Sequence, residues 1–194
     1  MTNREIRAKA RQDLGGGIFS NNWLLGLAVM FIYSLIIGVA GSVVPTIGAV
    51  LISGPLMVGL AGYFLAQSRD QNAPKIEKMF SGFSDFGSNF ILGFMMELFI
   101  FLWTLLFIIP GIVKAYAYSM APYIKNDHPE YSWKECMDES QRIMDGHKGQ
   151  LFLLHLSFIG WLLLGVLCCG IGTLWVSPYM EAANTNFYEM VRDN

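Results

Sequence analysis

Four polar side chains within apolar sequence are the residues of this chain that could do chemistry: Glu97, His155, Glu181 and Asn184. Charge inside a bilayer is costly, so ionisable residues there are rare and mark proton relays, ion pathways or substrate sites. A buried carboxylate is neutral unless a partner stabilises its charge. The four residues predict a polar cluster that relays protons or binds a cation. The blander alternative, and the commoner role for such residues, is hydrogen bonding that only holds helices together.

The basic residues indicate how these four are positioned. Of the 13 Lys and Arg residues, twelve lie in polar stretches, namely residues 1–22, 68–89, 125–150 and the last few residues. Basic residues are retained on the cytoplasmic side of a membrane. Each apolar block between these stretches therefore leaves the cytoplasm and returns to it, and both termini are expected to be cytoplasmic.

The three apolar blocks predict helical hairpins. They cover residues 23–67, 90–124 and 151–190, and 1–194 is expected to be a single integral membrane domain. The composition agrees, because 54% of the residues are hydrophobic and only 14% are charged, against about 25% charged in soluble domains. We expect an all-α, polytopic membrane helix bundle with about six transmembrane segments and amphipathic surface helices at the cytoplasmic face.

The turns of the hairpins are read from proline and glycine. Pro45 ends a first uncharged run that is too long for a secretory signal peptide. Gly54, Gly59 and Gly62 in the returning run permit close helix approach. Pro110-Gly111 suits a turn in the second block, and residues 168–172 are expected to form the third.

The second block has the weakest evidence for two crossings. Residues 112–124 are few for a full crossing. A return is favoured over one long kinked helix, because the basic stretch 125–150 follows and belongs on the cytoplasmic side. Lys114, the one basic residue outside the polar stretches, is expected to anchor the chain at the outer interface near the turn.

The polar connectors predict surface helices. Residues 3–14 separate an apolar face from a basic one, the pattern of a helix at an anionic bilayer surface. Ser132 and Glu135 form a capping-box signature for a helix to about Met144. Residues 76–86 show a similar apolar periodicity. The apolar face of the first helix consists of Ile6, Ala10 and Leu14, and its basic face of Arg4, Arg7 and Arg11.

Several function classes lack their usual sequence signals. The chain has no Gly-x-Ser-x-Gly, His-Glu-x-x-His or phosphate-binding Gly-Lys-Ser motif, so we expect no enzyme activity, no metal and no cofactor. A net charge of −2 with interleaved acidic and basic residues argues against nucleic acid as a partner. The amino-acid sequence gives no indication of homo-oligomer formation.

Particular motifs resemble a bacterial family of integral membrane proteins, the domain of unknown function 975. The resemblance rests on Arg4 to Arg11 before Asn22-Trp23, on Ile109 to Tyr123, and on later matches including Gly146-His147-Lys148 and Pro178-Tyr179. It covers nearly the whole chain, although the stretch from Gly15 to Ser20 is longer than the family pattern. More distantly, the Pro-Gly-Ile turn looks like the membrane domain attached to some glycerophosphodiester phosphodiesterases.

The resemblance implies location in a bacterial plasma membrane, typically of Gram-positive species, and no known activity. With the surface helices, it favours a non-enzymatic protein that contacts membrane lipids or another membrane complex, as an accessory to envelope, export or immunity functions. The alternative is a small transporter or channel that uses Glu97 and Glu181 for proton or cation coupling. Both residues lie at a similar expected depth, roughly 12 Å from the cytoplasmic side.

Overall fold

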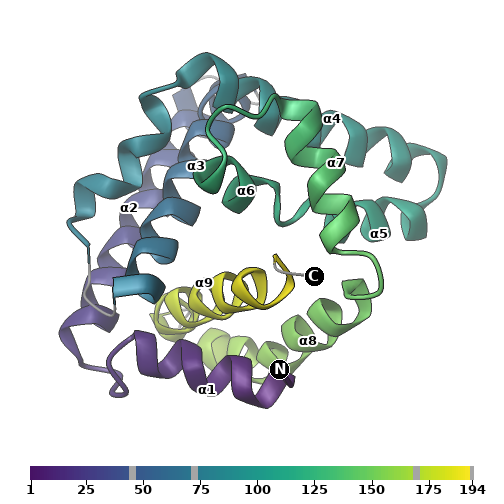
Figure 1. Cartoon of the computed structure of the whole chain (residues 1–194). Coiled ribbons are helices and arrows are strands. Elements are labelled where there is room, and N and C mark those ends of the chain that lie inside the picture. The colour runs from purple at the N-terminus through teal and green to yellow at the C-terminus, as the bar shows by residue number, and fades with distance from the viewer. Residues whose placement is uncertain (44–46, 71–73, 168–170, 193–194) are drawn as a thin grey trace.

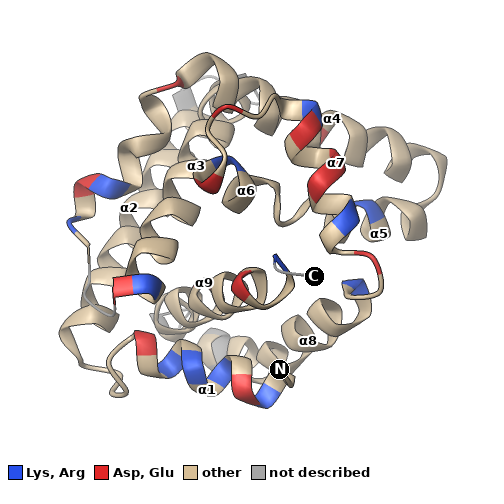
Figure 2. Ribbon diagram, in the orientation of Figure 1, with Lys and Arg blue, Asp and Glu red and all other residues tan. Residues whose placement is uncertain are grey.

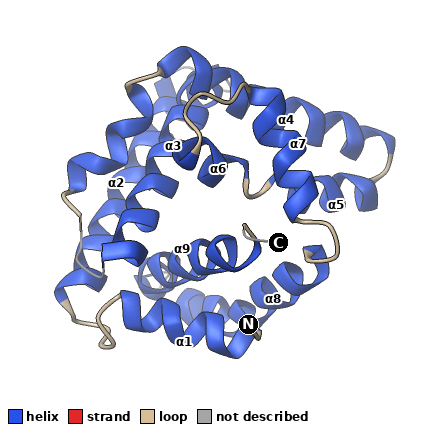
Figure 3. Cartoon of the chain, in the orientation of Figure 1, coloured by secondary structure: helices blue, strands red, loops and turns tan. Residues whose placement is uncertain are grey.

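Helices make up the chain in the computed structural model, which describes residues 1–43, 47–70, 74–167 and 171–192. No strand occurs within these residues (Figure 3). The predicted turns at Pro45 and around residues 168–170 lie outside the described part. In chain order the helices are α1 (Asn3–Asp13), α2 (Asn21–Val43), α3 (Ile47–Asp70), the 3-10 helix η1 (Ile76–Phe83), α4 (Phe86–Leu106), α5 (Ile108–Tyr118), α6 (Ala121–Asp127), α7 (Trp133–Ile143), α8 (Lys148–Leu167) and α9 (Ile171–Val191).

In the part of the chain that the structure describes, three helices are long and apolar enough to cross a membrane: α2, α3 and α4. The apolar part of α8, Lys148–Leu163, is shorter. Helices α2 and α3, α4 and α5, and α8 and α9 pack against each other as consecutive neighbours (Figure 1). An all-helical fold with membrane-type helices is therefore present, whereas six crossings stay a prediction.

The turn in the second block lies earlier than Pro110-Gly111. Helix α4 ends at Leu106, the single extended residue Phe107 follows (φ −156°, ψ 139°), and α5 starts at Ile108. Pro110 thus occupies the first turn of α5, where its missing N–H removes no intrahelical bond. The return is also broken, because α5 ends at Tyr118 and α6 starts at Ala121.

Helix α3 is the centre of the bundle. In its apolar window 61% of the residues are buried, against 11% in α2 and 22% in α4. Gly59 and Gly82 let η1 lie directly on the backbone of α3, because a Cβ at either position would collide with a carbonyl of the other helix. The connector after α3 therefore folds back onto the bundle and does not lie free at its surface.

The three predicted surface helices form: residues 3–14 as α1, the segment 76–86 in part as the 3-10 helix η1, and the segment after Ser132 as α7. Thr2 caps α1 and Ser132 caps α7, each in a capping box with the glutamate three residues later. Ile6, Ala10 and Leu14 are fully buried, and α1 packs on α9, so its apolar face is used within the protein and does not face lipid. On the basic face of α1, Arg4 and Arg11 are exposed and Arg7 is half-buried. Figure 2 shows the basic positions along this helix.

Candidate functional site

A cavity of about 310 Å³ with a mainly apolar wall and a few polar side chains lies between the helices of the bundle. We call it the central cavity. Helices α2, α3, α4, α8 and α9 contribute to its wall together with the α5–α6 segment. Its polar lining consists of Tyr33, Ser119, Tyr123, His155, Glu181 and Asn184.

Three of the four predicted cluster residues meet here. His155 Nε2 lies 2.8 Å from Asn184 Oδ1, and His155 Nδ1 lies 3.3 Å from the Tyr116 hydroxyl. The Tyr123 hydroxyl donates to Glu181 Oε2 at 3.2 Å, and the Asn184 amide, three residues along the same helix, favours the charge of Glu181. These contacts connect five side chains from α5, α6, α8 and α9 in one network.

The amide oxygen of Asn184 can only accept a hydrogen bond, and this determines which group donates in the other contacts of the network. Because Asn184 Oδ1 accepts from His155, the proton of a neutral imidazole is on Nε2 and its Nδ1 accepts from Tyr116. The amide nitrogen of Asn184 is then free to donate to Glu181. The carboxylate accepts a hydrogen bond from the Tyr123 hydroxyl, and the nearby Asn184 amide also favours its charged form.

Glu97 does not join this group. Its side chain is exposed on α4 and accepts a hydrogen bond of 2.9 Å from Ser53 Oγ of α3. The buried face of α4 consists instead of Asn89, Leu92, Gly93 and Met96. The predicted pair of carboxylates is thus divided, and only Glu181 lines the central cavity.

Lys114 lies against a connector helix. Its Nζ donates to Gln141 Oε1 of α7 at 2.6 Å and lies 5.4 Å and 5.5 Å from the ring centroids of Trp103 and Tyr118. Cation–π contacts of this length are favourable. The expected separation of Lys114 from the segment 125–150 is therefore not found.

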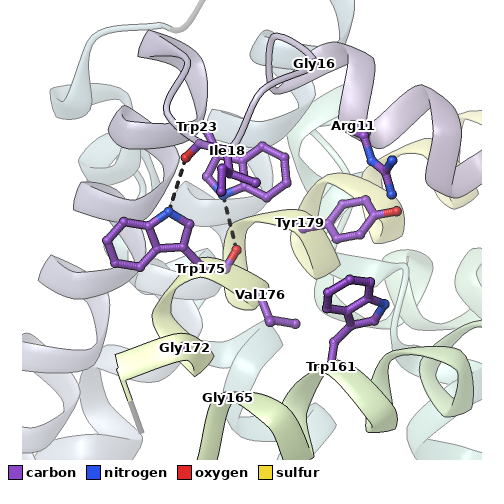
Figure 4. Close-up of a pocket in the computed structure, with 10 residues that line it drawn as sticks. All are labelled: Arg11, Gly16, Ile18, Trp23, Trp161, Gly165, Gly172, Trp175, Val176 and Tyr179. Atoms are coloured by element: carbon purple, nitrogen blue, oxygen red, sulfur yellow. Dashed lines mark hydrogen bonds between the residues drawn. The ribbon is translucent and has the colours of Figure 1, made fainter. Parts of the chain in front are cut away.

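A second cavity, of about 470 Å³, lies where α1 meets α8 and α9. We call it the aromatic cavity. Trp23, Trp161, Trp175 and Tyr179 form much of its wall, and Arg11 lies at its edge (Figure 4). This site could not be predicted from the sequence, because its residues lie far apart in the chain and each aromatic residue alone is typical of an interfacial aromatic belt.

Hydrogen bonds fix the wall of the aromatic cavity. Trp23 Nε1 donates to the Trp175 carbonyl and Trp175 Nε1 donates to the Ile18 carbonyl, both at 3.2 Å (Figure 4). The Tyr179 hydroxyl donates to the Arg7 carbonyl at 3.2 Å. The polar atoms of these rings are thus turned to protein partners, and their apolar faces are left for a ligand.

Arg11 supplies the charge at this site. Its guanidinium carbon lies 5.7 Å above the Tyr179 ring. Within the described residues, no carboxylate forms an ion pair with Arg4, Arg7, Lys9 or Arg11, whereas Arg69 and Arg142 are paired. The exposed face of α1 therefore carries Arg4 and Arg11 without an ion-pair partner, next to the capping residue Glu5, and Arg11 lies at the edge of an apolar cavity.

Comparison with known proteins identifies a family but no activity. A family model described as "Protein of unknown function (DUF975)" matches residues 1–116 and 105–194, which together cover the whole chain. No curated protein and no solved structure matches. The function must therefore be argued from the two cavities.

Proposed function

Because the chain belongs to DUF975, a family whose description names no activity, we propose its function from its geometry. The protein is a non-enzymatic membrane protein that acts through contacts with lipid, and the aromatic cavity holds one anionic phospholipid. The observation that carries this proposal is the unpaired Arg11 at the edge of an apolar, tryptophan-lined cavity.

The chemistry of the cavity suits such a ligand at both ends. An acyl chain requires an apolar slot, and about 470 Å³ falls within the usual range for ligand cavities. A phosphate requires cationic donors, which Arg11 and the neighbouring Arg4 and Arg7 supply on one face of α1. The exposed side chains of Ile18 and Phe19 beside the cavity suit the boundary between headgroups and acyl chains.

We expect Arg11→Gln to reduce the preference for anionic lipid about fivefold, because one basic residue near an anionic surface contributes about 1 kcal/mol. Protein purified in mild detergent is mixed with equal amounts of phosphatidylglycerol and phosphatidylcholine that carry the same acyl chains. Native mass spectrometry then gives the ratio of the two bound lipids. The matched control is Lys134→Gln, which removes an exposed charge on α7.

The lipid proposal makes two demands on this experiment. The wild-type protein must retain phosphatidylglycerol in preference to phosphatidylcholine, and Lys134→Gln must keep that preference. Equal retention of both lipids by the wild-type protein, or an unchanged ratio in Arg11→Gln, would contradict it.

A membrane topology can be proposed from the length of α5 and from the contact that Lys114 makes with α7. Sequence alone favours six crossings, with cytoplasmic termini in a bacterial plasma membrane. The 11 residues of α5 extend only about 16 Å, and Lys114 contacts α7 of the connector that the basic residues assign to the cytoplasm. We therefore propose that the first and third hairpins cross the bilayer. Although α4 alone is long enough to cross, we propose that the second hairpin lies tilted and enters the bilayer without reaching the outer surface. Lys114 is then an interfacial anchor on the cytoplasmic side.

Single cysteines test this topology in a cysteine-free background. With a membrane-impermeant maleimide, we expect Ser42→Cys and Thr173→Cys to react only from outside, and Asp145→Cys only from the cytoplasm. Ile109→Cys, at the tip of the second hairpin, should react from neither side until the membrane is dissolved. Reaction of Ile109→Cys from outside would restore six crossings, and reaction of all three tips from the cytoplasm would refute the crossings altogether.

A transporter or channel that uses Glu97 and Glu181 together is the second candidate. The hydrogen-bonded network around Glu181 favours it, whereas the position of Glu97 outside the central cavity does not. Any coupling would therefore depend on Glu181.

A further inference from the structure

The carboxylate of Glu181 has donors but no counter-charge. The Tyr123 hydroxyl donates to it at 3.2 Å and the nearby Asn184 amide also favours the charged form. Within the described residues, however, no Lys, Arg or His nitrogen lies within 4.0 Å of the Glu181 carboxylate oxygens, so Glu181 forms no ion pair there. The surrounding helices are apolar, so a charge there lacks compensation. A cationic ligand would complete the site.

The rest of the wall selects the kind of cation. Thioethers of Met30, Met57, Met96 and Met120 line the central cavity, and such side chains are polarizable and adapt to varied apolar shapes. The Tyr123 ring stacks on Tyr188 with centroids 5.4 Å apart. This lining suits the apolar body of an organic molecule.

An inorganic cation fits this lining poorly. Hard cations take six or more oxygen ligands, whereas most of the wall here is hydrocarbon and sulfur. The amide oxygen of Asn184 is already occupied by His155. Within the described residues, no group of three or more His, Cys, Asp or Glu side chains is arranged to hold a metal ion.

We infer that the central cavity binds a small organic monocation, an amine or quaternary ammonium with an apolar body, whose charge lies against Glu181. The volume of about 310 Å³ is at the lower end of ligand cavities, which limits the ligand to a molecule of one ring or similar bulk. This site is separate from the aromatic cavity, and the inference does not depend on the lipid proposal.

A matched pair of probes separates charge from shape. Phenyltrimethylammonium and tert-butylbenzene have nearly the same size and shape, but only the first is charged. Radiolabelled phenyltrimethylammonium is titrated onto the purified full-length protein, and unlabelled tert-butylbenzene is tested as a competitor. We expect saturable binding of the ammonium and weak competition by the hydrocarbon.

A matched pair of variants locates the charge. Glu181→Gln keeps a side chain of the same size and the acceptor for Tyr123, so it should fold and weaken ammonium binding by at least about tenfold, or 1.4 kcal/mol. Glu97→Gln makes the same change outside the cavity and should bind as the wild type does. Thermal unfolding of both variants verifies that they are folded.

Each other result overturns the inference. Equal binding by Glu181→Gln would remove the role of the carboxylate, and equal loss in Glu97→Gln would place the site elsewhere. Effective competition by tert-butylbenzene would reduce the cavity to a simple apolar pocket. An absence of saturable binding to the folded wild-type protein would exclude monocations of this size.

Discussion

Replacing Gly59 by alanine is expected to destabilise the protein by about 3 kcal/mol, at the upper end of the usual cost of overpacking. A Cβ at Gly59 would collide with the carbonyl oxygen of Met79, and a Cβ at Gly82 would collide with the carbonyl of Pro55. These are backbone atoms of η1 and α3, which cannot rotate away as a side chain does. The helices must separate, and the buried Met79 then loses its packing.

The measurement is thermal unfolding of detergent-purified protein, with Gly38→Ala as the matched control. Gly38 is an exposed position in the middle of α2, and a Cβ there has nothing within 4 Å. Alanine is favoured over glycine in a helix by about 0.5–1 kcal/mol, so Gly38→Ala should be neutral or stabilising. A Gly59→Ala variant as stable as Gly38→Ala would show that η1 does not lie on α3.

The sequence predicts the parts of the fold whose cause is local. The capping box predicted at Ser132 forms, because its two residues are only three apart in the chain. Thr2 and Glu5 form a second box with the same spacing, which was not predicted. The close approach at Gly59 was anticipated as helix contact, but its partner was not. Glycine spacing indicates that a backbone can approach closely and says nothing about which one does, so the folding of η1 onto α3 is visible only in the structure.

The candidate site was also predictable only where its residues lie close together in the chain. Glu181 and Asn184 are three residues apart on one helix and therefore share a face. Glu97 lies at a similar expected depth, but depth along a helix does not determine the direction in which a side chain points, and α4 turns Glu97 outward. Tyr116 and Tyr123, which complete the network, looked like ordinary membrane tyrosines in the sequence.

Asp127→Asn is the second substitution with a large expected effect. It should lower the free energy of unfolding by about 2 kcal/mol. The two carboxylate oxygens of Asp127 accept hydrogen bonds of 2.8 Å from Arg69, and the Tyr188 hydroxyl donates to it at 2.9 Å. These bonds join the ends of α3 and α9 to α6. The side chain of Arg69 is 40% exposed, so water takes over part of the lost interaction, and the cost stays below that of a fully buried ion pair.

The pH dependence of stability tests whether the charge of Asp127 causes the stability loss in Asp127→Asn. Burial alone would raise the pKa of Asp127, but the hydrogen bonds from Arg69 and Tyr188 outweigh it and lower the pKa below its ordinary value of 3.8. A carboxylate with a lowered folded-state pKa stabilises the fold fully above its unfolded pKa, and this contribution is lost as the pH falls through the folded value. The stability difference between wild type and Asp127→Asn should therefore be constant from about pH 7 to pH 5 and shrink below pH 3.8.

Denaturation in detergent at a series of pH values measures this difference, and Asp138→Asn is the matched control. Asp138 is exposed on α7, where a surface substitution should change stability by no more than about 0.5 kcal/mol. If Asp127→Asn and Asp138→Asn unfold alike at pH 7, the junction of α3, α6 and α9 does not depend on this ion pair. If the cost of Asp127→Asn instead stays unchanged as the pH falls from 3.8 until the protein unfolds, the side chain acts through its shape and hydrogen bonds, because the part that depends on its charge is lost as the carboxylate becomes protonated.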